Sequence, residues 1–371
     1  MESTYFSRRL SMLISFFILL FYAIRYLILS NTLRKKAQNI EPQELVGISI
    51  IVPFRNEAAS CSNFLNSIES LDFPQHLVEF IFCDDGSSDE SQTQVSTFVN
   101  SQVKSHALLL RKENQTGKKA LINEAVQLAK FDWIMLSDMD TTFDPKRLEH
   151  FALSAHPNLD LIIGKVELSR GSYIQNFQAL EYDLMMNLAE ASTKMHNPIL
   201  GSSANLMFRK EKFLKVEPYK NNLQIASGDD VFLINRLKDP KKQNSLFLSV
   251  DQATVNTKSH KDLASFFKQR IRWAGKNASV KDYLYQEVSW LSLLCNLSLV
   301  ILFCLAIFGF VDWLVVIGFL SIKTLIDLYF YYSSKSKQKF SLLFLLQFAV
   351  IYPIYVTFIG LLSCLIRPQW R

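Results

Sequence analysis

The sequence predicts an α/β domain with a mostly parallel mixed sheet, joined to α-helical membrane-spanning segments. Short, fully apolar runs of strand length alternate with helical stretches, which is typical of βαβ units. Acidic residues follow several of these runs directly, and long apolar stretches lie near both ends of the 371-residue chain. We therefore expect four regions: an N-terminal anchor at 1–36, the α/β domain at 37–258, an amphipathic interface segment at 259–287, and about three membrane helices at 288–371.

The amino-acid composition argues against some classes of binding partner and for others. The net charge is +6, but the lysines and arginines form no basic run interleaved with aromatic residues, so nucleic acid is a poor candidate partner. Several basic residues instead flank the apolar ends, where anionic lipid headgroups attract them. The five cysteines show no C-x-x-C spacing, which argues against a disulfide framework and against a zinc site.

The N-terminal segment at 10–30 is nearly all apolar and reaches the ~20 residues that a spanning helix needs. Its apolar core is longer than that of a signal peptide, and no small-residue cleavage site follows it. We expect an uncleaved anchor flanked by basic residues: Arg8, Arg9, Arg34, Lys35 and Lys36.

The α/β domain begins with an apolar, β-branched strand at 48–53, closed by Pro53. A helix is expected to start near Ala58. The pattern then continues with strands at 78–83 and 107–110, a helix at 118–130 and a strand at 133–136. The first strand is not followed by G-x-G-x-x-G, so a dinucleotide-binding Rossmann domain is unsupported.

Two pairs of acids follow predicted strands: Asp84 with Asp85, and Asp138 with Asp140. Ligands of open α/β sheets bind where parallel strands end, so the pairs should meet along one edge. Residues i and i+2 of extended backbone point the same way, which lets Asp138 and Asp140 converge on Mg²⁺ or Mn²⁺. Carboxylates also accept hydrogen bonds from a base or ribose, so a nucleotide-diphosphate site is expected. The alternative is a set of solvated loop acids.

Several motifs resemble those of family 2 glycosyltransferases with the GT-A fold, and they occur in family order over roughly residues 45–285. They are IIVPFRNE at 50–57, DDGS at 84–87, GKKALIN at 117–123, DMD at 138–140, GSSANLMFR at 201–209, GDD at 228–230 and QRIRW at 269–273.

On the donor side, the resemblance implies that Asp138 and Asp140 bind the divalent metal on the diphosphate. UDP is a poor leaving group unless its developing charge is neutralised, so a metal is chemically reasonable there. Lys118 and Lys119 could equally be solvated residues of an ordinary helix N-terminus. The implied donor-binding residues are Pro53, Arg55, Glu57, Asp84, Asp85, Lys118, Lys119, Asp138 and Arg272.

On the acceptor side, the resemblance implies that Asp229 and Asp230 form the catalytic acid pair, with Asp230 as the general base. The alternative is helix capping, because both acids open an apolar helical stretch at 231–237. The family often has glutamate where Asp229 stands. The implied acceptor-side residues are Ser203, Asn205, Gln269 and Trp273.

The C-terminal third predicts spans at 288–310, 313–332 and 342–366, preceded by the amphipathic segment. The alternative is that one span is re-entrant or interfacial. Between the last two spans lie Lys335, Lys337 and Lys339, which favour the cytosolic side. We therefore expect an integral protein of the cell or inner membrane with a cytosolic α/β domain.

Together these features predict a membrane-bound inverting glycosyltransferase. It would move a sugar from a UDP-sugar to a lipid-linked, glycolipid or polysaccharide acceptor. A catalytically silent membrane scaffold or transport partner with the same fold is the alternative. A phosphotransferase or nucleotidyltransferase is a weaker one, because it leaves the GDD and QRIRW motifs unexplained.

Overall fold

The computed structural model describes residues 2–36, 43–101, 106–112, 116–225, 227–334 and 338–365. The chain divides into two compact units. The α/β unit contains Lys36–His260, and the helical unit contains Met1–Lys35 and Lys261–Gln369. Each unit is built around its own apolar core.

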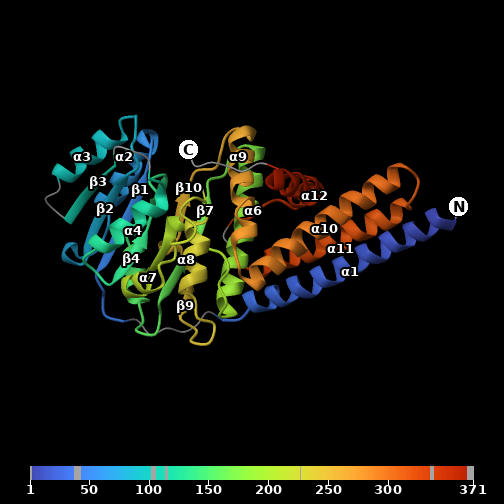
Figure 1. Cartoon of the computed structure of the whole chain (residues 1–371), viewed down its shortest axis with the longest axis horizontal. Helices are drawn as coiled ribbons and strands as arrows, with labels where there is room; N and C mark the ends of the chain where they lie inside the picture. The colour runs from blue at the N-terminus through green and yellow to red at the C-terminus, as the bar shows by residue number, and fades with distance from the viewer. Residues whose placement is uncertain are drawn as a thin grey trace. The chain divides into compact units, whose positions relative to one another are not determined.

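The α/β unit is built on a mixed sheet with strand order β3-β2-β1-β4-β8-β6-β9 (Figure 1). The first four strands in this order are parallel, β8 is antiparallel to both its neighbours, and β9 is parallel to β6. The bounds are β1 Ile48–Phe54, β2 Val78–Asp84, β3 His106–Arg111, β4 Trp133–Leu136, β6 Leu161–Gly164, β8 Leu206–Arg209 and β9 Ser245–Leu248. The predicted α/β fold is confirmed.

The register of the sheet explains why the acid-bearing loops meet. β1 and β4 are buried along their whole length, because their side chains are apolar on both faces. Ile51 pairs with Leu136, so these two strands end at the same edge. β2 ends level with β1, where Asp84 pairs with Phe54.

Helices and a small second sheet complete the α/β unit. The small sheet has the order β5-β10-β7, with bounds Thr141–Phe143, Val255–Thr257 and Val166–Leu168. The helices are α2 Ala58–Glu69, α3 Ser91–Ser101, α4 Lys118–Leu128, α5 Arg147–Leu153, α6 Tyr173–Lys194, α7 Lys210–Val216 and α8 Asp229–Leu237.

The helical unit contains α1 Glu2–Leu33, α9 Leu263–Ala274, α10 Tyr283–Ile307, α11 Trp313–Ser333 and α12 Leu342–Leu365. Among the described residues, four of these helices are long and apolar enough to cross a membrane: α1, α10, α11 and α12. α10 begins before the predicted span, because Asp282 caps it by accepting a hydrogen bond from the Tyr285 amide at 2.8 Å. Lys335 and Lys337 lie outside the described residues.

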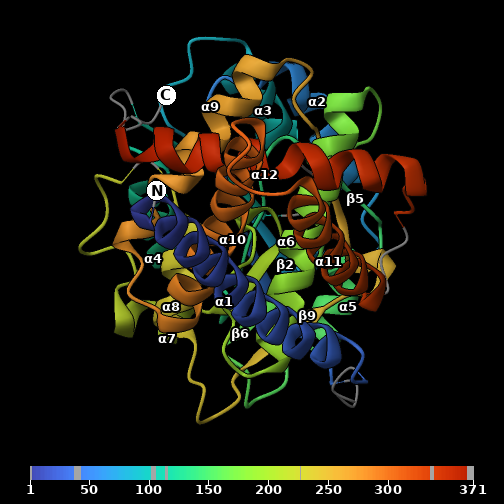
Figure 2. The same cartoon turned by 90° about the vertical axis from the view of Figure 1, so that its right-hand side faces the viewer.

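Within the helical unit, α12 does not run alongside the other long helices. Figure 1 views α12 nearly end-on, whereas α1, α10 and α11 extend along the picture; in Figure 2 it runs across the view. α12 packs on α9, α10 and α11.

Candidate active site

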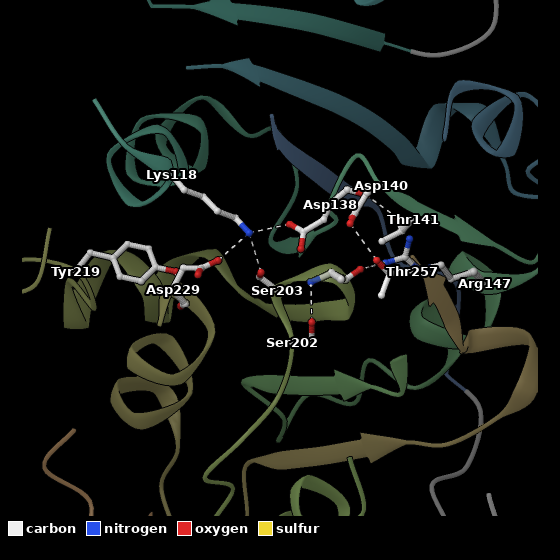
Figure 3. A network of polar contacts seen from close by, with 11 residues as sticks. Lys118, Asp138, Asp140, Thr141, Arg147, Ser202, Ser203, Tyr219, Asp229 and Thr257 are labelled. Carbon is white, nitrogen blue, oxygen red and sulfur yellow. Dashed lines mark hydrogen bonds and ion pairs between the residues drawn. The ribbon is translucent and has the colours of Figure 1, made fainter. Parts of the chain in front are cut away.

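Lys118 lies at the centre of a polar network at the carboxyl edge of the main sheet (Figure 3). Its Nζ is 2.7 Å from Asp138 Oδ1, 2.8 Å from Ser203 Oγ and 2.9 Å from Asp229 Oδ2. Burial opposes its positive charge, but the two carboxylates outweigh this and raise the pKa of Lys118. Asp138, Ser203 and Asp229, predicted separately for donor binding, acceptor binding and catalysis, thus all contact one ammonium group.

The loop before α4 aims Lys118 into this network. Gly117 has a φ of +85°, a conformation that a side chain would strain, and it stands at the N-terminus of α4. The carboxylate of Asp85 accepts hydrogen bonds from the amides of Thr116 at 2.8 Å and Gly117 at 3.1 Å. Asp85 is buried and therefore holds this loop; its predicted contact with a nucleotide stays a prediction.

Asp84 is also buried, at the end of β2. One carboxylate oxygen accepts hydrogen bonds from the Ser87 amide at 2.9 Å and the Ser87 hydroxyl at 2.6 Å. The other oxygen, Oδ2, has no hydrogen-bond partner among the described residues. A buried carboxylate oxygen without a partner is costly, so this atom is a candidate acceptor for a ligand hydrogen bond.

The carboxylates of Glu57, Asp138 and Asp140 form a cluster in the loops that follow β1 and β4. Burial and then Asp138 raise the pKa of Asp140, whose Oδ2 accepts a hydrogen bond from Thr257 Oγ1 at 3.1 Å. Burial, then Asp140 and Asp138, raise the pKa of Glu57 to about 7. Lys258 acts in the opposite direction.

This carboxylate cluster fits a divalent cation. Hard oxygen ligands under mutual repulsion are the donor set that Mg²⁺ or Mn²⁺ prefers. No group of three or more His, Cys, Asp or Glu side chains within the described residues is arranged to hold a metal by itself. Asp138 and Asp140 would therefore need further oxygen ligands from elsewhere, and a diphosphate could supply them.

The start of α8 assigns different contacts to its two acids. Gly228 is the N-cap residue, and it makes no side-chain capping hydrogen bond. Asp229 pairs with Lys118, and its backbone carbonyl accepts a hydrogen bond from the Tyr219 hydroxyl at 2.8 Å. Asp230 Oδ1 accepts a hydrogen bond from the Val231 amide at 2.7 Å, in the first turn. Capping therefore does not account for Asp229.

Lys119 points to a different place from Lys118. Its Nζ donates hydrogen bonds to the carbonyls of Asn222 at 2.8 Å and Ile225 at 3.0 Å, and it lies 4.5 Å from the centre of the Phe232 ring. Successive helical residues point about 100° apart, because a helix has 3.6 residues per turn. Lys119 thus anchors the segment before α8, and its predicted contact with the donor stays a prediction.

Arg147 is a buried member of the site that the sequence did not indicate. Its guanidinium donates hydrogen bonds to Asn205 Oδ1 at 3.1 Å, the Ala204 carbonyl at 3.1 Å and Ser137 Oγ at 3.2 Å. Burial lowers the pKa of Arg147 to about 9, and Asp138 acts against that change. No motif signals this role, because it depends on segments far apart in the sequence.

Asn205 is completely buried. Besides accepting from Arg147, its Nδ2 donates to the carbonyls of Lys165 and Ala253, both at 2.8 Å. The side chain therefore fixes the loop that presents Ser203. Its predicted contact with the acceptor stays a prediction.

The remaining predicted residues fall into two groups. In the α/β unit, Pro53 belongs to β1, and the buried Nε of Arg55 has no hydrogen-bond partner among the described residues. Gln269, Arg272 and Trp273 lie on α9 in the helical unit.

Comparison with known proteins identifies the family models that this chain matches. The model described as Glycosyl transferase family 2 matches residues 49–216, and the one described as Glycosyl transferase family group 2 matches residues 133–365. The second match covers more than half of the chain.

Relatives of known function are similar at low identity. A poly-beta-1,6-N-acetyl-D-glucosamine synthase of Staphylococcus epidermidis is 25% identical over 254 residues, covering 66% of this chain and 58% of the synthase. The glycosyltransferase AglE of Haloferax volcanii is 26% identical over 194 residues, covering 52% of this chain and 61% of the relative. The matches thus span less than two thirds of each relative.

Among solved structures, the mannosyltransferase PcManGT from Pyrobaculum calidifontis, in complex with GDP-Man and Mn²⁺, has the same fold. Its TM-score is 0.62 at 14% identity, and the match covers 95% of this chain and 99% of the mannosyltransferase.

Proposed function

Because the chain belongs to glycosyl transferase family 2, we propose that it is a membrane-bound inverting glycosyltransferase. It moves a sugar from a UDP-sugar to a lipid-linked, glycolipid or polysaccharide acceptor. The observation that carries this proposal is the convergence of Asp138, Ser203 and Asp229 on Lys118 at the carboxyl edge of the sheet.

On the donor side, Asp138 and Asp140 would hold Mg²⁺ or Mn²⁺ together with the diphosphate. The bound cation supplies Lewis-acid stabilisation of the charge that develops on the leaving UDP. Lys118 adds a positive field at the same place, because its raised pKa keeps the ammonium charged. Oδ2 of Asp84, which has no hydrogen-bond partner in the described parts of the chain, accepts a hydrogen bond from the nucleoside.

On the acceptor side, Asp230 removes the proton from the attacking hydroxyl. A hydroxyl is a weak nucleophile, and a carboxylate within hydrogen-bond reach removes its proton as the new bond forms. Asp229 holds Lys118 at 2.9 Å, so the neighbouring acid is the one assigned to proton transfer. A single in-line displacement with one base inverts the anomeric carbon.

The test uses the purified full chain in detergent with a panel of UDP-sugars and native membrane lipids as acceptors. We expect UDP release from one donor that stops with EDTA and returns with Mg²⁺ or Mn²⁺, together with a product whose mass rises by one sugar. GDP-mannose serves as a comparison donor. Stable binding of UDP without turnover of any donor would support the silent scaffold instead.

A further inference from the structure

α12 combines two properties that conflict in a simple span. Its segment Leu342–Ser363 is long and apolar enough to be a membrane-spanning helix. It nevertheless runs across α1, α10 and α11 within the helical unit (Figures 1 and 2). Helices that all cross one bilayer tilt on average by only about 20° from its normal, so these four cannot all be ordinary spans.

The middle of α12 packs on α9 through aromatic side chains. The ring of Tyr355 stacks on that of Phe266, with centroids 5.4 Å apart and planes 11° apart. The Phe358 ring meets Phe267 edge-on at 5.8 Å. Tyr355 lies well inside α12, so the central part of α12 shares the depth of α9.

α9 carries charged side chains close to this contact. The guanidinium of Arg270 lies 4.9 Å from the centre of the Phe266 ring, and Lys268 is exposed. Amphipathic helices of this composition lie in the plane of the membrane interface. The middle of a spanning helix lies ~15 Å from either surface of the ~30 Å hydrocarbon core, where charges are costly. The contact with α9 therefore favours an interfacial depth for α12.

The other long helices also carry charged residues within their apolar stretches. Arg25 of α1 donates a hydrogen bond to Glu287 of α10 at 2.7 Å, and Lys323 pairs with Asp327 on α11 at 2.6 Å. Tyr352 of α12 places its ring 5.7 Å from the Lys323 ammonium. α12 thus passes beside the Lys323–Asp327 ion pair of α11.

α12 also has the side-chain pattern of a helix that packs on protein along one side and exposes apolar side chains along another. Gly360 permits close crossing, because a Cβ there would come within 2.6 Å of Leu293 on α10. Another side of the helix carries an exposed apolar stripe at helical spacing; it consists of Leu343, Leu346, Val350, Ile354 and Leu361.

We propose that α12 lies in the plane of the membrane, at the depth of α9, with bilayer lipid covering its exposed apolar stripe. α1, α10 and α11 are then the helices that cross the bilayer. The end of α12 lies on the same side of the membrane as its start. This topology goes beyond the transferase reaction and does not depend on it.

The test measures depth at single cysteines in the full chain, reconstituted into lipid vesicles. Leu346, Ile354 and Leu361 of α12 are each replaced by cysteine in a background with Cys304→Ala and Cys364→Ala. Cys61, Cys83 and Cys295 are buried and remain in place. A fluorophore at each site is quenched by lipids that carry a nitroxide at a shallow or a deep acyl carbon.

We expect one ratio of shallow to deep quenching at all three α12 sites. Matched control sites on α10, at the exposed Trp290, Ile301 and Ile307, should give different ratios with Ile301 deepest, because Trp290 and Ile301 are about 16 Å apart along a helix. A deepest value at Ile354, like that at Ile301, would show that α12 spans. Weak quenching by both lipids at the α12 sites would show that protein covers the stripe. Either result overturns the proposal.

Discussion

At the scale of single residues, the proposed function assigns donor binding and proton transfer to different acids. Asp138 contacts Lys118 and lies in the carboxylate cluster with Asp140 and Glu57. Asp230 lies at the start of α8, where it accepts a hydrogen bond from the Val231 amide. Substitutions that keep side-chain shape distinguish these roles.

Asp230→Asn should keep UDP-sugar binding while transfer falls on the order of 10²–10⁴-fold, the usual contribution of a general base. Asp138→Asn should weaken both UDP-sugar binding and sugar transfer, because a neutral amide is a poorer ligand for a hard cation. Calorimetric UDP titration with and without Mn²⁺, alongside initial rates, measures the contrast. Near-normal turnover in a folded, donor-binding Asp230→Asn protein would remove Asp230 as the base.

Glu57 should make stability depend on pH near neutrality. Its pKa is raised to about 7 in the folded chain, so the folded state holds this proton more tightly than the unfolded state. Stability should therefore fall as pH rises from about 4.5 to about 7, and Glu57→Gln should remove that part of the decline. Thermal unfolding in metal-free detergent solution at pH 5 and pH 7.5 tests this. An equal change in Tm for the wild type and the variant would contradict it.

At the scale of elements, α4 directs two adjacent lysines to different tasks. Lys118 reaches the acids at the sheet edge, whereas Lys119 binds the carbonyls of Asn222 and Ile225 before α8. The first contact belongs to the candidate site, and the second fixes the segment that leads into Asp229 and Asp230.

Lys119→Met should destabilise the fold by about 1–3 kcal/mol, because two partly buried carbonyls lose their donor. UDP affinity of the folded fraction should change little. Lys118→Met is the matched control, and it should lower UDP affinity because positive charge leaves the diphosphate site. Denaturant unfolding and UDP titration of both variants give the comparison. Lost UDP affinity at full stability in Lys119→Met would assign that lysine to the donor instead.

At the scale of the whole molecule, the expected topology of the membrane helices predicts on which side the site lies. Nucleotide sugars are cytosolic, and the three lysines at Lys335, Lys337 and Lys339 favour the same side. With α10 and α11 counted as spans, we expect residues 36–282 on that side as well.

Cysteine labelling of intact cells should therefore leave Ser336→Cys unlabelled until the membrane is permeabilised. A cysteine in the α10–α11 connection, at Gly309, is the control and should react from outside. Strong external labelling at Ser336→Cys would invert the proposed orientation.

The sequence by itself determined the first four strands of the main sheet and the long apolar helices. β1 and β4 follow from apolar runs, the acids at the strand ends follow from their position after those runs, and the long helices follow from apolar length. These features depend on neighbouring residues, because side-chain periodicity and the burial of apolar surface are local properties of the chain.

Only the tertiary structure decided which of these residues meet. Lys118 contacts Ser203 and Asp229, Arg147 joins Ser137 to Asn205, and the direction of α12 depends on its packing. Each contact links segments whose spacing along the chain says nothing of their distance in space. Two adjacent lysines or two equally apolar helices look alike in sequence, and the surfaces that they pack against give them different positions.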